Sequence, residues 1–127
     1  MIIGIGVDLI EVDRVVKACQ KESFLKRYYT EQEISLIEQD IKKSADNFAV
    51  KEAVVKMLGT GFRGIEPKEI EVLRNKEGKP YVRLYGNAAS EAAKQRITDI
   101  HVSITNTKDF ANAFVIGEYR GPMSNGG

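Results

Sequence analysis

Phe48-Ala-Val-Lys-Glu-Ala-Val-Val-Lys-Met-Leu-Gly-Thr-Gly61 is the most informative stretch of this sequence. It predicts a helix from Phe48 to Leu58, with Asn47 as the N-cap and Gly59 as its natural end. Apolar side chains cover so much of this helix that we expect it to be largely buried.

The charged residues of the helix, Lys51, Glu52 and Lys56, share one face at about 100° per residue. One interpretation is an ordinary surface pair of a glutamate and the lysine one turn later, worth a few tenths of a kcal/mol. If the helix is buried, however, a carboxylate and an amine that face inward need partners or a ligand. The helix pattern alone favours the surface pair.

Gly59, Thr60 and Gly61 follow the helix and predict a loop that a ligand can approach closely. The threonine hydroxyl can donate to a phosphate. The alternative is a simple glycine helix stop. The stretch is not a Walker loop, because the lysine precedes the glycines.

Residues 1–8 predict a β-strand in which apolar side chains alternate with Gly4, Gly6 and Asp8. Asp8 therefore points to the face that the glycines leave open. Proteins commonly hold Mg²⁺ with one or two carboxylates, completed by phosphate oxygens and water. Asp8 and Glu52 suit such a site if they meet in space, and otherwise Asp8 is a turn cap.

A polar stripe is predicted on the strand from Ile100 to Thr105, where His101, Ser103 and Thr105 share one face. The stripe contains the only histidine of the chain. The stripe is either a solvent-exposed strand face or a binding face. A single histidine more often has a structural role than a binding role.

Basic side chains gather early in the chain, where Arg14, Lys17 and Lys21 share one helix face. Five basic residues and one acid between Arg14 and Arg27 leave a local excess of four positive charges, in a chain of net charge +1. Such a run is usually a solvated face. Its concentration on one helix instead favours an acidic partner or a phosphate.

The other predicted elements alternate irregularly between helices and hairpin-like strand pairs, which favours an α+β fold over a doubly wound parallel sheet. They are a helix that begins near Arg14 with Asp13 as its cap, a helix from Thr30 with Thr30 and Glu33 in capping-box spacing and an apolar stripe at Ile34, Ile37 and Ile41, strands at 69–74 and 79–85 around a turn at 75–78, a short helix through Lys94 with Asn87 as its cap, and strands at 100–105 and 110–118 around a turn at 106–109. Residues 121–127 are expected to be mobile.

Size and composition are typical of one folded domain in a reducing compartment. The 127 residues, 43% of them apolar, can form a core without disulfide or metal staples. The balance of 19 Lys and Arg against 18 Asp and Glu argues against a general nucleic-acid binder. Cys19, the only cysteine, is interpreted as a small structural residue. We find no signal-peptide pattern and no membrane-length apolar stretch, so we expect a cytoplasmic protein without a membrane partner.

Three blocks taken together resemble the carrier-protein synthases, the holo-[acyl-carrier-protein] synthase type of the 4′-phosphopantetheinyl transferase superfamily. Ile3 to Leu9 resembles the family's G-x-G-x-D strand, residues 48–61 its F-x-x-K-E-A-x-x-K-x-x-G-T-G signature, and His101 to Thr105 its H-V-S-I-[ST] strand. The resemblance implies the family's small α+β fold, an antiparallel-rich sheet packed with a long helix. It also implies a single catalytic domain at residues 1–118 and a flexible tail at residues 119–127.

The resemblance implies transfer of the 4′-phosphopantetheine arm of coenzyme A to a serine of apo acyl carrier protein, for fatty acid biosynthesis, with release of 3′,5′-ADP. It further implies Mg²⁺ as cofactor and a homotrimer with active sites between subunits. Glu52, acting through a water, is the first candidate for the general base, and His101 is the second. The residues assigned to these roles are the Mg²⁺ ligands Asp8 and Glu52, the catalytic residues Glu52, Lys56 and His101, the coenzyme A contacts Lys56, Gly59, Thr60, Gly61, Lys79, Pro80, His101, Ser103 and Thr105, and the carrier-docking residues Arg14, Lys17 and Lys21.

Two departures from the family pattern and two rival functions complete the sequence interpretation. Asn106 stands where many relatives have a second histidine or a serine-rich turn, and Met57 stands where a small residue is common. The first rival, a binding module of the same fold without transfer activity, is disfavoured by the intact Asp8, Glu52 and Lys56. The second, a small RNA-binding α+β domain, is disfavoured by the near-neutral charge and the lack of aromatic pairs on the strands.

Overall fold

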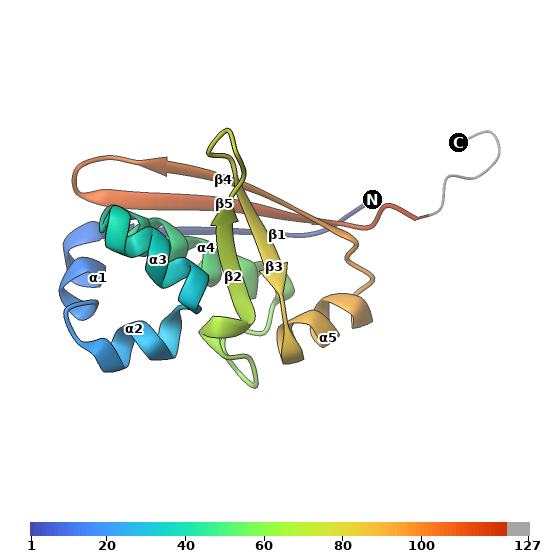
Figure 1. Ribbon diagram of the computed structural model, residues 1–127. Helices are drawn as coiled ribbons and strands as arrows, with labels where there is room; N and C mark the ends of the chain where they lie inside the picture. Colours follow the sequence, from blue (N-terminus) through green and yellow to red (C-terminus); the bar gives the residue numbers. More distant parts are fainter. Residues whose placement is uncertain (122–127) are drawn as a thin grey trace.

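The computed structural model describes residues 1–121, which form five α-helices, a short 3₁₀ helix and two antiparallel sheets (Figure 1). The elements in chain order are β1 (Ile2–Glu11), α1 (Val12–Ala18), α2 (Glu22–Tyr28), α3 (Glu31–Gln39), α4 (Lys42–Leu58), η1 (Pro67–Glu69), β2 (Ile70–Arg74), β3 (Pro80–Leu84), α5 (Gly86–Lys94), β4 (Asp99–Asn106) and β5 (Phe110–Glu118). This content confirms the predicted α+β class.

A three-stranded sheet in the order β1-β5-β4 runs along one side of the molecule, with α4 packed on its inner face (Figure 1). Gly4 and Gly6 of β1 face α4. A Cβ atom at Gly6 would lie 1.9 Å from the carbonyl oxygen of Ala53. Only glycine lets the two backbones approach this closely, so this contact fixes where β1 and α4 place their other side chains.

The outer face of the same sheet carries large apolar side chains that no other described element covers. Ile5, Val7 and Leu9 of β1 are 60%, 49% and 61% exposed, and Phe114 opposite Val7 on β5 is 41% exposed. A contiguous apolar surface of this kind marks an interaction site more often than a solvated face.

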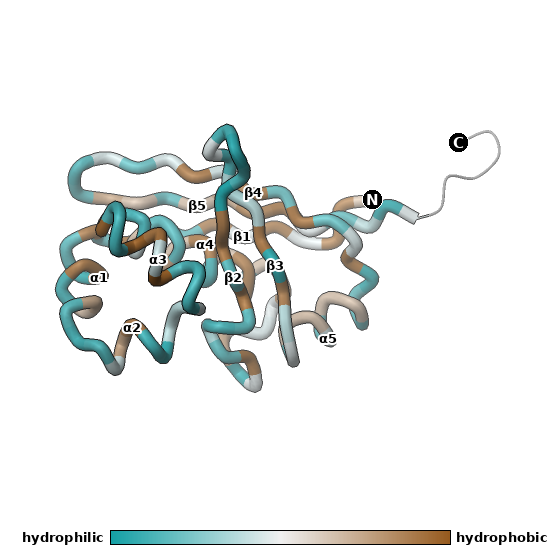
Figure 2. The backbone as a smooth tube through the Cα atoms, viewed as in Figure 1, coloured by the Kyte–Doolittle hydropathy of each residue, from teal (hydrophilic) through white to brown (hydrophobic). Residues whose placement is uncertain are grey.

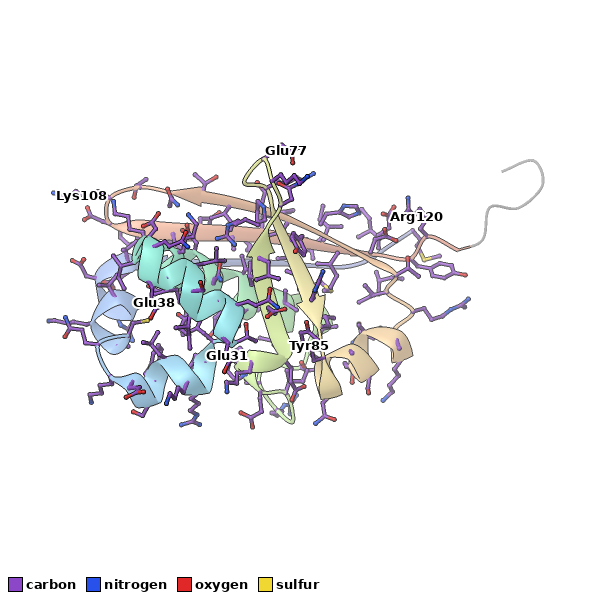
Figure 3. All side chains as sticks on the ribbon, viewed as in Figure 1. Glu31, Glu38, Glu77, Tyr85, Lys108 and Arg120 are labelled. Atoms are coloured by element: carbon purple, nitrogen blue, oxygen red, sulfur yellow. The ribbon has the colours of Figure 1, made fainter. Side chains whose placement is uncertain are left out.

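The β2–β3 hairpin forms the second sheet and agrees with the predicted strands to within one residue at each end. Asn75 Oδ1 accepts hydrogen bonds from the backbone N–H groups of Glu77 and Lys79, at 3.0 and 2.9 Å, and so closes the predicted turn. Glu77 marks the tip of this turn, and Lys108 marks the tip of the turn between β4 and β5 (Figure 3). The backbone is hydrophilic at the β2–β3 turn, whereas hydrophobic and hydrophilic residues alternate within the two strands (Figure 2).

Helix α4 is longer than predicted, because it begins at Lys42 rather than at Phe48. The prediction of Asn47 as its N-cap is wrong. Asn47 lies inside the helix, fully buried, and its Nδ2 donates to Glu33 Oε2 at 3.0 Å and to the Val72 carbonyl at 2.9 Å. These tertiary partners satisfy an amide that would otherwise favour a helix end. Gly59 ends the helix in the left-handed conformation, with φ 77°, as predicted.

The basic segment forms two helices rather than one. Asp13 lies in the first turn of α1 and is not its cap, which corrects the prediction. Lys21 lies beyond α1, at the N-cap position of α2. The rings of Phe24 and Tyr28 stack with centroids 4.3 Å apart and give α2 an apolar side. The charge pattern alone does not reveal this second helix.

The capping box predicted at the start of α3 is confirmed. Thr30 Oγ1 accepts from the backbone N–H of Glu33 at 3.3 Å, and the backbone N–H of Thr30 donates to Glu33 Oε1 at 3.1 Å. Ile41 lies outside α3 and is 45% exposed, so the predicted apolar stripe ends earlier. Asn87 is likewise misplaced as a cap, because it lies inside α5 and Tyr85 occupies the N-cap position.

Cys19 is buried near the Tyr29 hydroxyl, with 4.0 Å between sulfur and oxygen, as its interpretation as a structural residue predicts. Of the predicted tail, residues 122–127 lie outside the described residues. The backbone N–H of Tyr119 donates to the Met1 carbonyl at 2.8 Å, and Arg120 pairs with Asp99 at 2.8 Å. Residues 119 and 120 are therefore held against the end of the sheet. Within residues 1–121, no helix has the length and apolar character needed to cross a membrane.

Candidate active site

Asp8 and Lys56 meet where β1 faces the last turns of α4. Lys56 Nζ lies 2.9 Å from Asp8 Oδ1 and 3.2 Å from the Val7 carbonyl oxygen. Asp8 stands on the same strand face as Gly6, so the close approach at Gly6 brings its carboxylate to the helix. The Asp8 side chain is 13% exposed and that of Lys56 is 55% exposed. The ammonium is therefore open to a ligand from solvent while it contacts Asp8.

Glu52 lies one helical turn before Lys56 and joins the same group. Partial burial raises the pKa of Glu52, the negative charge of Asp8 raises it further, and Lys56 lowers it. The charges of both Asp8 and Lys56 thus act on the Glu52 carboxylate, so the three side chains share one neighbourhood. Two carboxylates are the usual protein contribution to a Mg²⁺ site, so these residues fit that ion. Within residues 1–121 no group of three or more His, Cys, Asp or Glu residues could hold a metal ion.

Lys51 does not belong to this group, although the helix pattern places it with the other charged residues of α4. Its ammonium is buried, and it donates to Glu33 Oε1 at 2.8 Å and to the backbone carbonyls of Pro67 and Ile70. Burial raises the pKa of Glu33 and lowers that of Lys51, whereas their mutual attraction acts the other way. Every hydrogen-bond partner of the Glu33 carboxylate is a donor, so the pair is ionised. It anchors α4 to α3 and to the start of β2.

The predicted polar stripe of β4 lies on the outer face of the sheet, whereas Asp8 lies on the inner face of β1. His101 pairs with Ile116 and Asp8 pairs with Ala113, and neighbouring residues of a strand alternate between faces. One chain therefore does not bring the stripe to the group formed by Asp8, Glu52 and Lys56. The exposed members of the stripe are His101, Ser103 and Thr105.

A pocket of about 380 Å³ opens between β3 and β4. It gathers Lys79, Pro80 and His101, three residues predicted to contact coenzyme A, together with the ring of Tyr81. A lysine, an imidazole and an aromatic ring around one opening suit a ligand that carries both a ring and a phosphate.

The loop formed by Gly59, Thr60 and Gly61 leaves the end of α4 close to Lys56. Its three backbone N–H groups donate to the carbonyls of Lys56 and Val55 at the end of the helix. Thr60 Oγ1 donates to the Gly61 carbonyl at 2.8 Å. The loop therefore offers a ligand a hydroxyl and open glycine surface, rather than the free amides that cradle phosphates in other glycine loops.

A second pocket, of about 330 Å³, lies between the end of β1, α1, α2 and α4. Arg14 lines it together with the aromatic side chains of Phe24, Tyr28, Phe48 and Phe110. Lys17 and Lys21 are exposed beyond it. The sequence interpretation did not predict this pocket. The available signal was the spacing of Phe24 and Tyr28, one helical turn apart, within the basic segment.

The two residues that depart from the family pattern have structural contacts. Asn106 Nδ2 donates to both carboxylate oxygens of Asp46, at 2.9 and 3.0 Å, and ties the end of β4 to α4. The Met57 side chain fills the space above Gly117, where an added Cβ atom would lie 2.5 Å from its sulfur. Both residues therefore serve the packing of the sheet on α4.

Comparisons with known proteins agree with this arrangement. A profile of the 4′-phosphopantetheinyl transferase superfamily matches residues 4–115. Holo-[acyl-carrier-protein] synthase of Lachnoclostridium phytofermentans is 64% identical over 118 residues, which cover 93% of this chain and 97% of that protein. Acyl carrier protein synthase of Plasmodium yoelii with ADP bound superposes with a TM-score of 0.84 at 31% identity, over 95% of this chain and 98% of that one. Holo-(acyl-carrier-protein) synthase of Bacillus anthracis in complex with CoA (3′,5′-ADP) gives a TM-score of 0.78 at 32% identity, over 94% and 99%.

The chain belongs to the 4′-phosphopantetheinyl transferase superfamily, a class of enzymes whose fold and sequence blocks it shares. Within this superfamily its similarity is to the holo-[acyl-carrier-protein] synthases, which confirms the family predicted from the three blocks.

Proposed function

We propose that the chain transfers the 4′-phosphopantetheine group of coenzyme A to a serine of apo acyl carrier protein and releases 3′,5′-ADP. The observation that carries the proposal is the convergence of Asp8, Glu52 and Lys56 between β1 and α4, in a chain of this family. Displacement at a diphosphate needs charge neutralisation and in-line positioning more than covalent help from the protein. Two carboxylates that can hold a metal ion, together with an exposed ammonium, can neutralise the charge of the diphosphate and position it.

The chain's own residues divide the work at this site. Asp8 and Glu52 would hold Mg²⁺, which when bound supplies charge neutralisation for the diphosphate. The Lys56 ammonium, exposed beside Asp8, contacts the diphosphate and stabilises charge on the leaving 3′,5′-ADP. Glu52 lies close enough to Asp8 for that charge to act on it, and is proposed to take a proton from the carrier serine through a water.

Glu52 is favoured over His101 as the base because Glu52 lies near Asp8 within one chain, whereas His101 needs a second copy to reach that group. His101, Lys79 and Pro80 instead line the pocket between β3 and β4, which supports a role for these side chains in holding the nucleotide end of coenzyme A. Ser103 and Thr105 continue the same strand face and extend this proposed contact surface.

We propose a homotrimer in which each active site lies between two subunits. The exposed apolar stripe of Ile5, Val7, Leu9 and Phe114 supports a subunit interface on the outer face of the sheet. A second copy is also what could bring the face that carries His101 to the group that contains Asp8.

We propose that the acyl carrier protein docks on α1 and the turn after it. Arg14, Lys17 and Lys21 supply positive charge toward an acidic carrier helix, and the aromatic pocket beside Arg14 offers an apolar contact. The carrier of fatty acid biosynthesis is the proposed substrate. The unpaired, buried Cys19 supports a reducing, cytoplasmic location.

Mass spectrometry tests the proposed reaction directly. The protein, incubated with coenzyme A, Mg²⁺ and an apo acyl carrier protein, is expected to add the mass of one phosphopantetheine group to the carrier serine. Carrier that keeps its apo mass, in a reaction where an unrelated transferase modifies the same preparation, would contradict the proposal.

A further inference from the structure

Glu118 at the end of β5 holds the only histidine of the chain. Its Oε1 lies 2.9 Å from His101 Nε2. Glu118 stands two residues beyond Ile116, the partner of His101 in the strand register, so both side chains project from the outer face of the sheet. The side chains are 58% exposed for His101 and 34% exposed for Glu118. No motif of the sequence drew attention to this glutamate.

The contact fixes which ring nitrogen carries a proton. An ionised carboxylate can only accept hydrogen bonds, so the N–H that faces Glu118 must be on Nε2. The imidazolium form and the neutral form with the proton on Nε2 both satisfy this requirement. The other neutral tautomer would set a lone pair against the carboxylate. Glu118 therefore leaves Nδ1 as the ring nitrogen available to a ligand, in either protonation state.

The neighbouring carboxylate on this face has other partners. Asp99 lies opposite Glu118 in the register, and its Oδ2 accepts from Arg120 at 2.8 Å while its Oδ1 accepts from Thr98 Oγ1 at 2.7 Å. Within residues 1–121, His101 is the one side chain that the Glu118 carboxylate contacts by a hydrogen bond. The two acids thus have separate roles, and Asp99 offers a matched control.

We propose that Glu118 is a positioning residue for the reaction: it holds the His101 imidazole through Nε2, so that Nδ1 faces coenzyme A in the pocket beside Lys79. The proposal rests on the proposed function for the identity of the ligand. The hydrogen bond itself does not depend on that function. This arrangement matches sites in which a carboxylate fixes the tautomer and orientation of a histidine that acts on something else.

Nuclear magnetic resonance of the ligand-free protein tests the hydrogen bond without any assay of activity. Because the chain has one histidine, the ring signals of a ¹⁵N-labelled sample all belong to His101, and their couplings to the carbon-bound ring protons distinguish Nδ1 from Nε2. The wild type, at a pH where the ring is neutral, is expected to show a proton on Nε2 alone. Glu118→Ala is expected to give signals averaged over both tautomers. Glu118→Gln keeps a carbonyl acceptor and is expected to resemble the wild type, as is the control Asp99→Asn.

A double-mutant cycle tests whether Glu118 acts through His101. Glu118→Ala is expected to raise KM for coenzyme A by about two- to fivefold, the range of an exposed charged pair. In a His101→Ala background the same change is expected to have no further effect. Glu118→Gln is expected to restore most of the loss.

Two results would overturn the positioning role. One is an unchanged tautomer pattern in Glu118→Ala, and the other is an equal loss from Glu118→Ala with and without His101. A wild type that transfers nothing to the carrier would instead contradict the proposed function, and the tautomer pattern would still decide whether Glu118 holds the ring.

Discussion

Glu52 has two proposed roles, as a metal ligand and as the general base. Among single residues, its carboxylate is therefore the most informative one to substitute. Glu52→Gln keeps the shape of the side chain and removes its charge. Transfer is expected to fall by about a hundredfold or more, the lower end of what loss of a positioned acid–base group costs. The rate of carrier modification at saturating coenzyme A and Mg²⁺ measures this change.

The matched control is Glu38→Gln, because Glu38 is an exposed glutamate on α3 (Figure 3), an element that carries none of Asp8, Glu52 and Lys56. It is expected to leave the rate unchanged. Both variants are expected to unfold at the urea concentration of the wild type. A folded Glu52→Gln protein with near-normal turnover would rule out both roles proposed for this carboxylate.

Cys19 gives a pH-dependent prediction that is independent of the active site. Burial raises the pKa of its thiol above the ordinary value of 9.0, while contacts with Ser44 and Tyr29 lower it in part. In the unfolded chain the thiol ionises first, so the unfolded state binds fewer protons and the free energy of unfolding falls as the pH rises through this range. The stability that this group contributes is complete below about pH 9 and is lost above it.

Urea unfolding of the wild type and of Cys19→Ala, compared from about pH 8 to about pH 10.5, isolates this effect from other groups that titrate there. The wild type is expected to lose up to about 1.4 kcal/mol per pH unit more than the variant. Parallel curves for the two proteins would show that burial does not raise the pKa of the thiol.

At the scale of elements, the buried pair of Lys51 and Glu33 joins α4 to α3 and to the start of β2. Lys51→Met leaves the Glu33 carboxylate without its ion partner in the core. The free energy of unfolding is expected to fall by about 3 to 5 kcal/mol, the usual cost of breaking a buried pair. Glu33→Gln together with Lys51→Met removes both charges and is expected to recover part of that loss. Urea titrations followed by circular dichroism measure each change.

Lys43→Met is the matched control for this experiment, because Lys43 lies on the same helix and its pair with Asp40 is partly exposed, at 3.4 Å. It is expected to cost at most about 1 kcal/mol. If Lys51→Met cost no more than Lys43→Met, the pair would not anchor α4.

The basic segment forms two helices, α1 and α2, so the test of carrier docking can change one residue in each part of the proposed surface. Reversing Arg14 and Lys21 to Glu changes one residue on α1 and one at the start of α2, on both sides of the proposed surface. KM for the carrier is expected to rise about tenfold at low ionic strength, and the difference should shrink as salt screens the charges. KM for coenzyme A is expected to stay unchanged.

Lys94 lies in the last turn of α5, at the opposite end of the molecule from α1, and serves as the control for charge (Figure 1). Lys94→Glu changes net charge by the same amount per residue, away from α1. An equal rise in the carrier's KM with this variant would assign the effect to overall charge rather than to a docking surface.

Elements with local signals could be predicted from the sequence, and elements set by distant contacts could not. The capping box of Thr30 and Glu33 and the helix stop at Gly59 depend on neighbouring residues, so their patterns sufficed. Asn47 has the chemistry of a cap, but Glu33 and Val72 hold its amide inside α4. Likewise, no glycine or proline lies between α1 and α2, so the sequence gives little sign of the break after Ala18.

At the scale of the whole molecule, the candidate site could be predicted residue by residue but not as an arrangement. The alternation along β1 placed Asp8 beside Gly4 and Gly6, and the helix pattern placed Glu52 one turn from Lys56. The relation between Asp8 and His101 depends on the register in which β1 and β4 each pair with β5, which is a matter of long-range pairing. That register sets the two residues on opposite faces of one sheet, a result that neither strand pattern contains.

This separation yields a test of the proposed shared site. If one subunit supplies Glu52 and another supplies His101, a mixture of two impaired variants, Glu52→Gln and His101→Ala, can regain activity. Unfolding and refolding the two together at equal amounts should give sites with both native residues in about a quarter of cases, by random assembly of a cyclic oligomer. Activity after co-refolding is expected to exceed the mean of the variants refolded separately.

Disrupting the apolar stripe on the outer face of the sheet tests whether such a rescue depends on assembly of subunits. Phe114→Asp places a charge among Ile5, Val7 and Leu9, so it is expected to shift the mass measured by light scattering from that of a trimer toward that of a single chain. Introduced into both partners of the mixing experiment, it is expected to abolish the rescue, because the proposed complementation needs assembly. Rescue that persists at the mass of a single chain would show that complementation does not depend on assembly through this stripe, and would contradict the proposed interface. Failure of rescue in intact trimers would instead place both residues' functions within a single subunit's reach.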